Sequence, residues 1–306
     1  MQSKPRMIEW HCGIGGVSAA VGDRFEILAA IDIKREAADV YSNNFPRHQI
    51  VIKNIDSISD SVVAGWGSAD IWWMSPPCQP HTVLGKRMDM ADPRSASFAR
   101  MLQLIDRFRP SFLAMENVPG FGESISRNLL IEALEKAGYS YREETLCPTQ
   151  FGWPNRRNRY YLVASRNPIN LFKSADVSFI RKSSLNDFIS IQEDDNLELH
   201  LEQEFIMRYG GAIHLADRFL PHEMTNCFTS AYGRSATRCG SYLRISRDEN
   251  LLRARRFSPR EVLNLLDFPQ EYQLPGDLSP KKLWPMVGNS LTLGVVKYML
   301  SQLPIW

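Results

Sequence analysis

The sequence predicts an α/β protein with a Rossmann-like, doubly wound, mostly parallel sheet and an added smaller lobe. Short apolar strands alternate with amphipathic helices through the first half of the chain. The alternation stops near residue 167, and 306 residues suit one large domain carrying a smaller one. We therefore expect a main domain over 1–166, a small lobe over 167–255, and C-terminal helices over 256–306 that return to the main domain.

The elements of the main domain follow one another at short spacing. Strands are predicted over 7–10, 25–33, 49–52, 70–74, 112–115, 139–146 and 159–164. Helices are predicted from residue 17 and over 36–44, 95–108 and 129–137. Only a short loop joins the last two strands, so we expect them to form an antiparallel hairpin at one sheet edge.

Two helices are predicted near the C-terminus. Ser258, Pro259 and Glu261 have the spacing of a capping box with proline in the first turn, which starts a helix that runs to about Asp267. A last helix is expected over 291–303.

Composition bounds the class of protein. The chain is 44% hydrophobic and 23% charged, with a net charge of +2. No apolar run is long enough to cross a bilayer, and the polar N-terminus lacks a signal pattern, so we expect a cytoplasmic protein, or a nuclear one if it is eukaryotic. Five cysteines without regular spacing favour reduced thiols over disulfides.

Local charge says more than net charge. Residues 234–260 contain eight arginines, at positions 234, 238, 244, 247, 253, 255, 256 and 260, against two acids. Such a run is either a solvated face or a phosphate-binding surface, and the sequence leaves both open.

Four features fall just beyond the ends of predicted strands: a glycine cluster at 12–16, Asp32, Cys78 and Glu116. Parallel strands end at one edge of the sheet, where open α/β sheets bind their ligands. The glycine spacing fits neither the dinucleotide fingerprint nor a phosphate loop, so a cofactor without phosphates fits better. Asp32 could accept hydrogen bonds from a ribose, and Asp56 from an adenine amino group; helix cap and loop acid are the alternatives.

Cys78 lies in a segment stiffened by Pro76, Pro77 and Pro80. A cysteine held rigidly at a ligand-binding edge is either a nucleophile or a buried structural thiol. No second cysteine or histidine stands at ligand spacing, so we expect no metal.

Glu116 ends an apolar strand, where burial would keep its carboxyl protonated and able to donate a proton. Capping a helix and pairing with an arginine are the alternatives. Arg157 and Arg159 are two residues apart and face one way if they share a strand, either inward to hold a carbonyl or phosphate, or outward to solvent.

Together these segments resemble the cytosine carbon-5 methyltransferase family. The ordered set is Gly13-Ile14-Gly15-Gly16, Asp32, Asp56, Pro76-Pro77-Cys78-Gln79, Glu116-Asn117-Val118, Arg157-Asn158-Arg159 and Gly288-Asn289-Ser290. The resemblance implies that 1–166 binds S-adenosylmethionine, which leaves as S-adenosylhomocysteine, and that 167–255 recognises the target. The implied cofactor-binding residues are Cys12, Gly13, Ile14, Gly15, Gly16, Val17, Asp32, Ile33, Asp56, Ser57, Pro76, Asn289 and Ser290.

The resemblance also implies the catalytic roles. The Cys78 thiolate adds to carbon 6 of cytosine, and Glu116 protonates or hydrogen-bonds ring nitrogen 3. Arg159 holds the carbonyl at carbon 2, and Arg157 supports that carbonyl or the thiolate. The target base must leave its stack or loop.

One branch of the family, which acts on cytosine 38 of aspartate tRNA, is the most similar. Cys227-Phe228-Thr229 with Tyr232-Gly233, the segment 75–80, and Asp92 with 94–98 match that branch. His81 and Arg238-Cys239 depart from its pattern and could shift which tRNA is recognised. The expected nucleic-acid contacts are Gln79, Arg94, Ser97, Cys227, Thr229, Tyr232, Arg238, Arg244 and Arg247.

The expected partner is therefore tRNA, with tRNA-Asp foremost, and the enzyme is expected to act as a monomer. Three alternatives stay open: a DNA cytosine methyltransferase with the same chemistry, a catalytically silent nucleic-acid-binding relative, and a nicotinamide-dependent oxidoreductase. The intact Cys78, Glu116 and arginine pair weigh against the second, and the glycine spacing weighs against the third.

Overall fold

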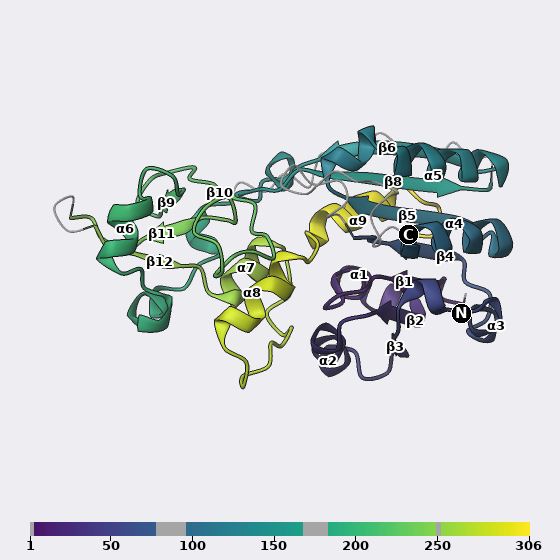
Figure 1. Ribbon diagram of the computed structural model, residues 1–306, viewed down its shortest axis with the longest axis horizontal. Coiled ribbons are helices and arrows are strands. Elements are labelled where there is room, and N and C mark those ends of the chain that lie inside the picture. Colours follow the sequence, from purple (N-terminus) through teal and green to yellow (C-terminus); the bar gives the residue numbers. More distant parts are fainter. Residues whose placement is uncertain (1–2, 78–95, 168–182, 249–251) are drawn as a thin grey trace. The chain divides into compact units, whose positions relative to one another are not determined.

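The computed structural model describes residues 3–77, 96–167, 183–248 and 252–306. The chain divides into two compact units, whose elements are labelled in Figure 1. Unit 1 comprises Met1–Leu146, Asn158–Asp176 and Val295–Trp306, and unit 2 comprises Cys147–Arg157 and Val177–Gly294.

Unit 1 is built on a seven-stranded sheet in the order β3-β2-β1-β4-β5-β8-β6. Its strands are β1 (Arg6–Trp10), β2 (Glu26–Asp32), β3 (Ile50–Ile52), β4 (Ile71–Met74), β5 (Phe112–Asn117), β6 (Ser140–Leu146) and β8 (Arg159–Ser165). The pairs from β3 to β5 are parallel, whereas β8 runs antiparallel to both β5 and β6. The predicted mostly parallel sheet with an antiparallel hairpin at its edge is confirmed.

The strand order reverses direction between β1 and β4. The chain adds β2 and β3 on one side of β1, then returns to add β4 and β5 on the other. Right-handed crossovers in both directions place helices on both faces, which is double winding, and sheets of this kind bind ligands at the carboxyl ends of the strands where the order reverses, here β1 and β4. The glycine cluster follows β1, and Pro76 follows β4.

The core of unit 1 explains the apolar strands. Trp10 packs edge-to-face against Trp72 at 5.3 Å between ring centroids, and against Trp66 at 5.8 Å. Trp73 on β4 is also buried, so this strand is covered on both faces. The helices of unit 1 are α1 (Gly16–Val21), α2 (Arg35–Asn44), α3 (Asp60–Gly65), α4 (Ala96–Phe108) and α5 (Ile125–Lys136), with α9 (Leu293–Ser301) at the C-terminus.

Unit 2 holds a three-stranded sheet in the order β12-β11-β9 and a separate pair, β10-β7. The strands are β7 (Asn155–Arg156), β9 (Leu215–Asp217), β10 (Thr225–Asn226), β11 (Tyr242–Arg244) and β12 (Ala254–Arg256). The helices are α6 (Gln203–Tyr209), α7 (Pro259–Leu265) and α8 (Pro280–Gly288). Strands of two or three residues are too short to show alternation, so the sequence indicated irregular structure here.

The compact units divide the chain differently from the three expected segments. Helices α7 and α8 belong to unit 2, and only the last residues from Val295 belong to unit 1. The capping box at Ser258 forms as predicted, but its Glu261 also pairs with Arg255 on β12. The indole nitrogen of Trp284 on α8 donates to the Phe257 carbonyl at 2.9 Å. These contacts join the helices to unit 2.

Candidate functional site

The glycine cluster forms a tight turn between β1 and α1. Gly13 and Gly15 both adopt positive φ, and the Gly13 amide donates to the Asp32 Oδ2 atom at 2.8 Å. The other Asp32 oxygen accepts from the Lys34 amide at 2.8 Å. Each carboxylate oxygen has a second lone pair, so Asp32 can still accept hydrogen bonds from a ligand. The structure thus places the two predicted motifs in contact at the sheet edge.

Glycine is required at position 15 for space as well as for backbone conformation. A Cβ there would lie 2.6 Å from the Phe45 ring and 2.8 Å from the Tyr41 ring. Residues 12 and 14–17 are mostly buried, so this turn presents backbone more than side chain to any ligand.

Ile33, Asp56 and Ser57 lie near the same edge, after β2 and β3. Ile33 is 61% exposed, which is unusual for a large apolar residue. Asp56 is an exposed residue of a short 3₁₀ turn, where the Ser57 hydroxyl donates to the Asn54 carbonyl at 2.7 Å. An exposed apolar side chain next to Asp32 in the chain, at the edge where Asp56 also lies, suits a nucleoside.

A buried acid under the glycine turn was missed by the sequence analysis. Glu9 on β1 is 1% exposed and accepts a hydrogen bond from the Ser18 hydroxyl at 2.6 Å. That hydroxyl also lies 2.7 Å from the Tyr41 hydroxyl, which in turn lies 3.0 Å from His48 Nδ1. Burial raises the pKa of Glu9 to about 7, against the hydrogen bonds from Ser18. The signal in the sequence that could have indicated Glu9 is its position as an acid inside an apolar strand.

The titration of Glu9 predicts a pH dependence of stability. A folded-state pKa above the unfolded value of 4.5 means that its stabilising contribution is complete below pH 4.5 and is lost as pH rises through 7. Relative to Glu9→Gln, the wild type should lose on the order of 3 kcal/mol of unfolding free energy between pH 5 and pH 8. Guanidinium denaturation of both proteins at the two pH values measures this difference.

The comparison with Glu9→Gln is needed because a neighbouring group titrates in the opposite sense. Burial lowers the pKa of His11 to about 4, so its contribution to stability grows as pH rises from 4 towards 6.5. This term is common to both proteins and cancels. Parallel pH profiles of the two proteins would contradict the assignment to Glu9.

The segment that leads to Cys78 is held against β5. Pro76 is buried, and its carbonyl accepts from Asn117 Nδ2 at 3.2 Å, while the Trp73 indole donates to the Ser75 hydroxyl at 2.8 Å. The resemblance gave Asn117 no role, but here it anchors the loop. Cys78, Gln79 and Arg94 lie outside the described residues.

Glu116 and Arg159 form an ion pair on adjacent antiparallel strands. The Arg159 Nε atom lies 3.0 Å from Glu116 Oε1, and the two side chains are 14% and 11% exposed. Of the alternatives that the sequence left open for Glu116, the structure shows pairing with an arginine. Both groups keep some exposure at the carboxyl end of β5.

Arg157 is separated from Arg159 by a break between β7 and β8, so the strand alternation does not hold for the pair. Its guanidinium is buried in unit 2 and donates to three carbonyls: Phe228 at 2.8 Å, Gly288 at 3.2 Å and Ser290 at 2.5 Å. Arg157 thus joins two predicted motifs, Cys227-Phe228-Thr229 and Gly288-Asn289-Ser290.

Those two motif segments also touch directly. A Cβ at Gly288 would lie 2.3 Å from the Thr229 carbonyl oxygen, so only glycine permits this approach. Cys227 Sγ lies 3.4 Å from the Arg157 Nη1 atom. Asn289 is exposed at the end of α8, and the Ser290 side chain is buried.

Two expected nucleic-acid contacts are buried instead. Tyr232 is 1% exposed; its hydroxyl donates to the Ser241 carbonyl at 2.7 Å and accepts from the Phe257 amide at 2.9 Å. Ser97 is buried in the first turn of α4. This burial supports structural roles for both residues rather than contact with nucleic acid.

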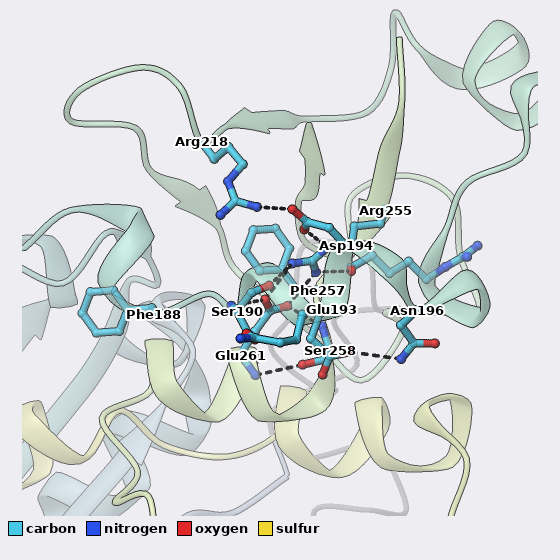
Figure 2. A network of polar contacts seen from close by, with 12 residues as sticks. Phe188, Ser190, Glu193, Asp194, Asn196, Arg218, Arg255, Phe257, Ser258 and Glu261 are labelled. Atoms are coloured by element: carbon cyan, nitrogen blue, oxygen red, sulfur yellow. Dashed lines mark hydrogen bonds and ion pairs between the residues drawn. The ribbon is translucent and has the colours of Figure 1, made fainter. Parts of the chain in front are cut away.

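Much of the arginine-rich stretch is engaged inside unit 2. Arg255 is fully buried and donates to both Glu261 oxygens and to Asp194, each at 2.8 Å. Figure 2 shows these contacts. Arg244 pairs with Asp217 at 3.1 Å. The stretch is therefore no uniform phosphate-binding surface, and charge reversal at Arg244 would break a bridge within the unit.

Two of the expected nucleic-acid contacts in this stretch are exposed, Arg238 and Arg247. The Arg247 guanidinium lies over the Phe219 ring at 4.8 Å from its centroid. The Arg238 side chain has no hydrogen bond or ion pair with another described residue.

The described residues contain no group of three or more histidine, cysteine, aspartate and glutamate side chains that could hold a metal ion. Within those same residues, none of the helices has the length and apolar character that crossing a bilayer requires.

Comparison with known proteins covers nearly the whole chain. The family described as C-5 cytosine-specific DNA methylase matches residues 5–304. A tRNA (cytosine(38)-C(5))-methyltransferase of Spodoptera frugiperda is 33% identical over 97% of this chain and 98% of its own. The Schizosaccharomyces pombe protein of that name is 31% identical over 97% and 96%.

Solved structures agree with this similarity. A crystal structure of Spodoptera frugiperda DNMT2 has a TM-score of 0.85 at 32% identity, covering 98% of this chain and 99% of its own. The S. pombe Dnmt2 methyltransferase has a TM-score of 0.86 at 26% identity, covering 98% of each chain. The resemblance stated from the motifs is confirmed.

Proposed function

Because this chain belongs to the family of C-5 cytosine-specific DNA methylases, we propose that it methylates carbon 5 of cytosine 38 in a tRNA, with tRNA-Asp as the expected substrate. The observation that carries the proposal is the gathering of motifs at the sheet edge of unit 1. There Gly13 bonds Asp32, Asn117 holds Pro76, and Glu116 pairs with Arg159. The whole-length similarity to tRNA cytosine-38 methyltransferases supports tRNA over DNA.

The residues at the edge fit S-adenosylmethionine. The glycine turn offers backbone to a ligand without phosphates, Asp32 keeps lone pairs for ribose hydroxyls, and the exposed Ile33 provides an apolar surface for adenine. Asp56 would accept from the adenine amino group. When bound, this cofactor supplies an electrophilic methyl group. Asn289 and Ser290 remain expected cofactor contacts.

The chain's own residues activate the pyrimidine. The Cys78 thiolate forms a bond to carbon 6, and Glu116 holds or supplies a proton at ring nitrogen 3, so carbon 5 gains the electron density to take a methyl group. Arg159 holds the carbonyl at carbon 2. Loss of the carbon-5 proton then breaks the bond between sulfur and carbon 6 and restores the thiolate.

Arg157 is a positioning residue in this scheme. Its buried contacts to Phe228, Gly288 and Ser290 fix the loops of unit 2 that carry predicted substrate and cofactor contacts. The enzyme is expected to act as a monomer on cytoplasmic tRNA.

Glu116→Gln is expected to slow methyl transfer by about 10²–10⁴-fold, because general acids typically supply that much rate. The amide keeps the shape but cannot pass a proton to nitrogen 3. Single-turnover methylation at saturating RNA measures the effect. Glu123→Gln in the 3₁₀ turn that follows β5 is the control, and a rate within a few-fold of wild type for Glu116→Gln would contradict the role.

The proposed substrate is tested by bisulfite sequencing of tRNA and of genomic DNA after incubation with enzyme and cofactor. Conversion-resistant cytosine at tRNA position 38 alone supports the proposal, and modification of DNA alone refutes it. A stable adduct with 5-fluorocytosine RNA would separate a working enzyme from a silent relative, because carbon 5 then has no proton to lose.

A further inference from the structure

Unit 2 contains a hollow that the proposed chemistry does not use. Its volume is about 420 Å³, within the range of about 300–1,000 Å³ typical of small-ligand sites. One part of its wall is the segment Asn226, Cys227 and Thr229, and another is the loop with Arg238 and Gly240. His214 also lines it.

The wall presents unsatisfied hydrogen-bonding groups on a fixed backbone. Asn226 lies on β10, and its backbone amide donates to the Ser241 hydroxyl at 2.7 Å. Its side-chain carboxamide forms no hydrogen bond with another described residue. The Thr229 hydroxyl accepts from the Ala231 amide at 3.2 Å, which leaves its own proton for a ligand. A carboxamide offers a donor and an acceptor side by side, which matches the edge of a nucleobase.

The loop that carries Arg238 is held in a costly conformation. Arg238 has φ +56°, a left-handed value that is unfavourable for a residue with a side chain. The next residue is fixed because the Cys239 carbonyl accepts from the Thr229 amide at 3.0 Å. Gly240 is packed so closely that a Cβ would lie 2.7 Å from the Phe228 ring. The fold thus maintains an exposed arginine at the hollow.

The charge around the hollow favours a phosphate. Arg238 has no carboxylate partner among the described residues, in contrast to Arg244 and Arg255. Burial lowers the pKa of His214, with Arg156 acting in the same direction and Glu223 against it, so the imidazole is neutral near pH 7. Arg156 brings a second positive charge and Glu223, whose carboxylate lies 3.9 Å from His214 Nε2, brings a negative one, so Arg238 carries the net positive charge at the hollow.

We propose that this hollow binds one unpaired nucleotide of a single-stranded RNA loop, with its base against Asn226 and Thr229 and its phosphate on Arg238. The inference rests on the proposed function only in taking RNA as the partner. The nucleotide is not the target cytosine, whose ring contacts are assigned to Glu116 and Arg159. The hollow would therefore select the sequence around the target.

Binding of a fluorescein-labelled RNA hairpin with an unpaired loop, followed by anisotropy over a range of salt, tests the phosphate contact. Arg238→Gly should weaken binding about tenfold and lower the salt slope by about 1, because one phosphate contact is lost. Glycine accepts positive φ, so this variant should fold, and thermal unfolding checks it. Arg238→Lys should keep most of the affinity.

Arg208→Ala is the matched control, because Arg208 is an exposed arginine of unit 2 on α6 whose guanidinium lies over the Tyr209 ring. It should bind within about twofold of wild type, since Arg208 does not line the hollow and a surface charge that makes no phosphate contact contributes little. Arg238→Gly with wild-type affinity and salt slope, or Arg208→Ala with an equal loss, would overturn the phosphate contact.

The base contact is tested by removing one loop base at a time from the hairpin. Removal of the base at one loop position should weaken binding to the wild-type protein. In the Asn226→Ala variant, removal of that same base should have no further effect on affinity, so the two losses are not additive. If the losses in affinity from Asn226→Ala and from base removal add at every position, the base contact is overturned. Equal affinity for a DNA hairpin of the same sequence would overturn the choice of RNA. Wild-type protein that binds through Arg238 but transfers no methyl group would refute the proposed function and leave this inference standing.

Discussion

Cys78→Ala is expected to abolish methyl transfer while leaving S-adenosylmethionine affinity within about twofold of wild type. Without the thiolate, no bond forms at carbon 6, and carbon 5 of cytosine stays too poor a nucleophile to accept the methyl group. The cofactor residues at Gly13 and Asp32 belong to different segments of the sheet edge, so their hydrogen bond should persist. Tritium incorporation into tRNA and calorimetric cofactor titration measure the two quantities.

Cys147→Ser provides the matched control for this experiment. Cys147 is a half-buried thiol beside a 3₁₀ turn, where its sulfur accepts from the Thr149 hydroxyl at 3.1 Å. It has no assigned role in the chemistry, so activity should be retained. Methylated RNA from the Cys78→Ala protein would show that another group is the nucleophile.

Glu261→Ala is expected to lower the free energy of unfolding by about 3–5 kcal/mol, because it leaves the fully buried Arg255 guanidinium without its main partner. The substitution also removes acceptors for the Ser190 and Ser258 amides, each at 2.8 Å. Figure 2 shows how these groups surround Glu261 at the start of α7. Urea denaturation followed by circular dichroism measures the loss.

A double variant separates the ion pair from the rest of the site. Arg255→Met combined with Glu261→Leu removes both charges and should be more stable than Glu261→Ala alone, because no charge is left buried without a partner. If the double variant loses as much unfolding free energy as Arg255→Met and Glu261→Leu lose together, the ion pair is not the source of the lost stability.

The sheet of unit 1 could be predicted because its strands are long and apolar. The strand expected over 112–115 is observed over 112–117, and the final hairpin lies at the predicted edge. Helix α5 begins at Ile125, earlier than predicted, because the Ser124 hydroxyl accepts from the Arg127 amide. Helix α8 was missed, since Pro285 lies inside it and reads as a helix breaker.

The site was predictable where a residue acts through backbone position and less so where it acts through a distant partner. Gly13 and Asp32 follow strand ends, so the topology brings them together. The partners of Arg157 come from Phe228, Gly288 and Ser290, and no local pattern indicates contacts over such separations. The arginines at 244 and 255 looked like a surface because Asp217 and Asp194, which pair with them, lie elsewhere in the chain.

Unit 2 takes its strand β7 from residues 147–157 and everything else from 177–294. During synthesis, the guanidinium of Arg157 has left the ribosome long before the carbonyls of Gly288 and Ser290 exist to receive it. Of its three acceptors, only the Phe228 carbonyl is made earlier. The full set of hydrogen bonds can form only once residue 290 has been made, and a premature stop codon before residue 288 would deny the guanidinium two of its three acceptors.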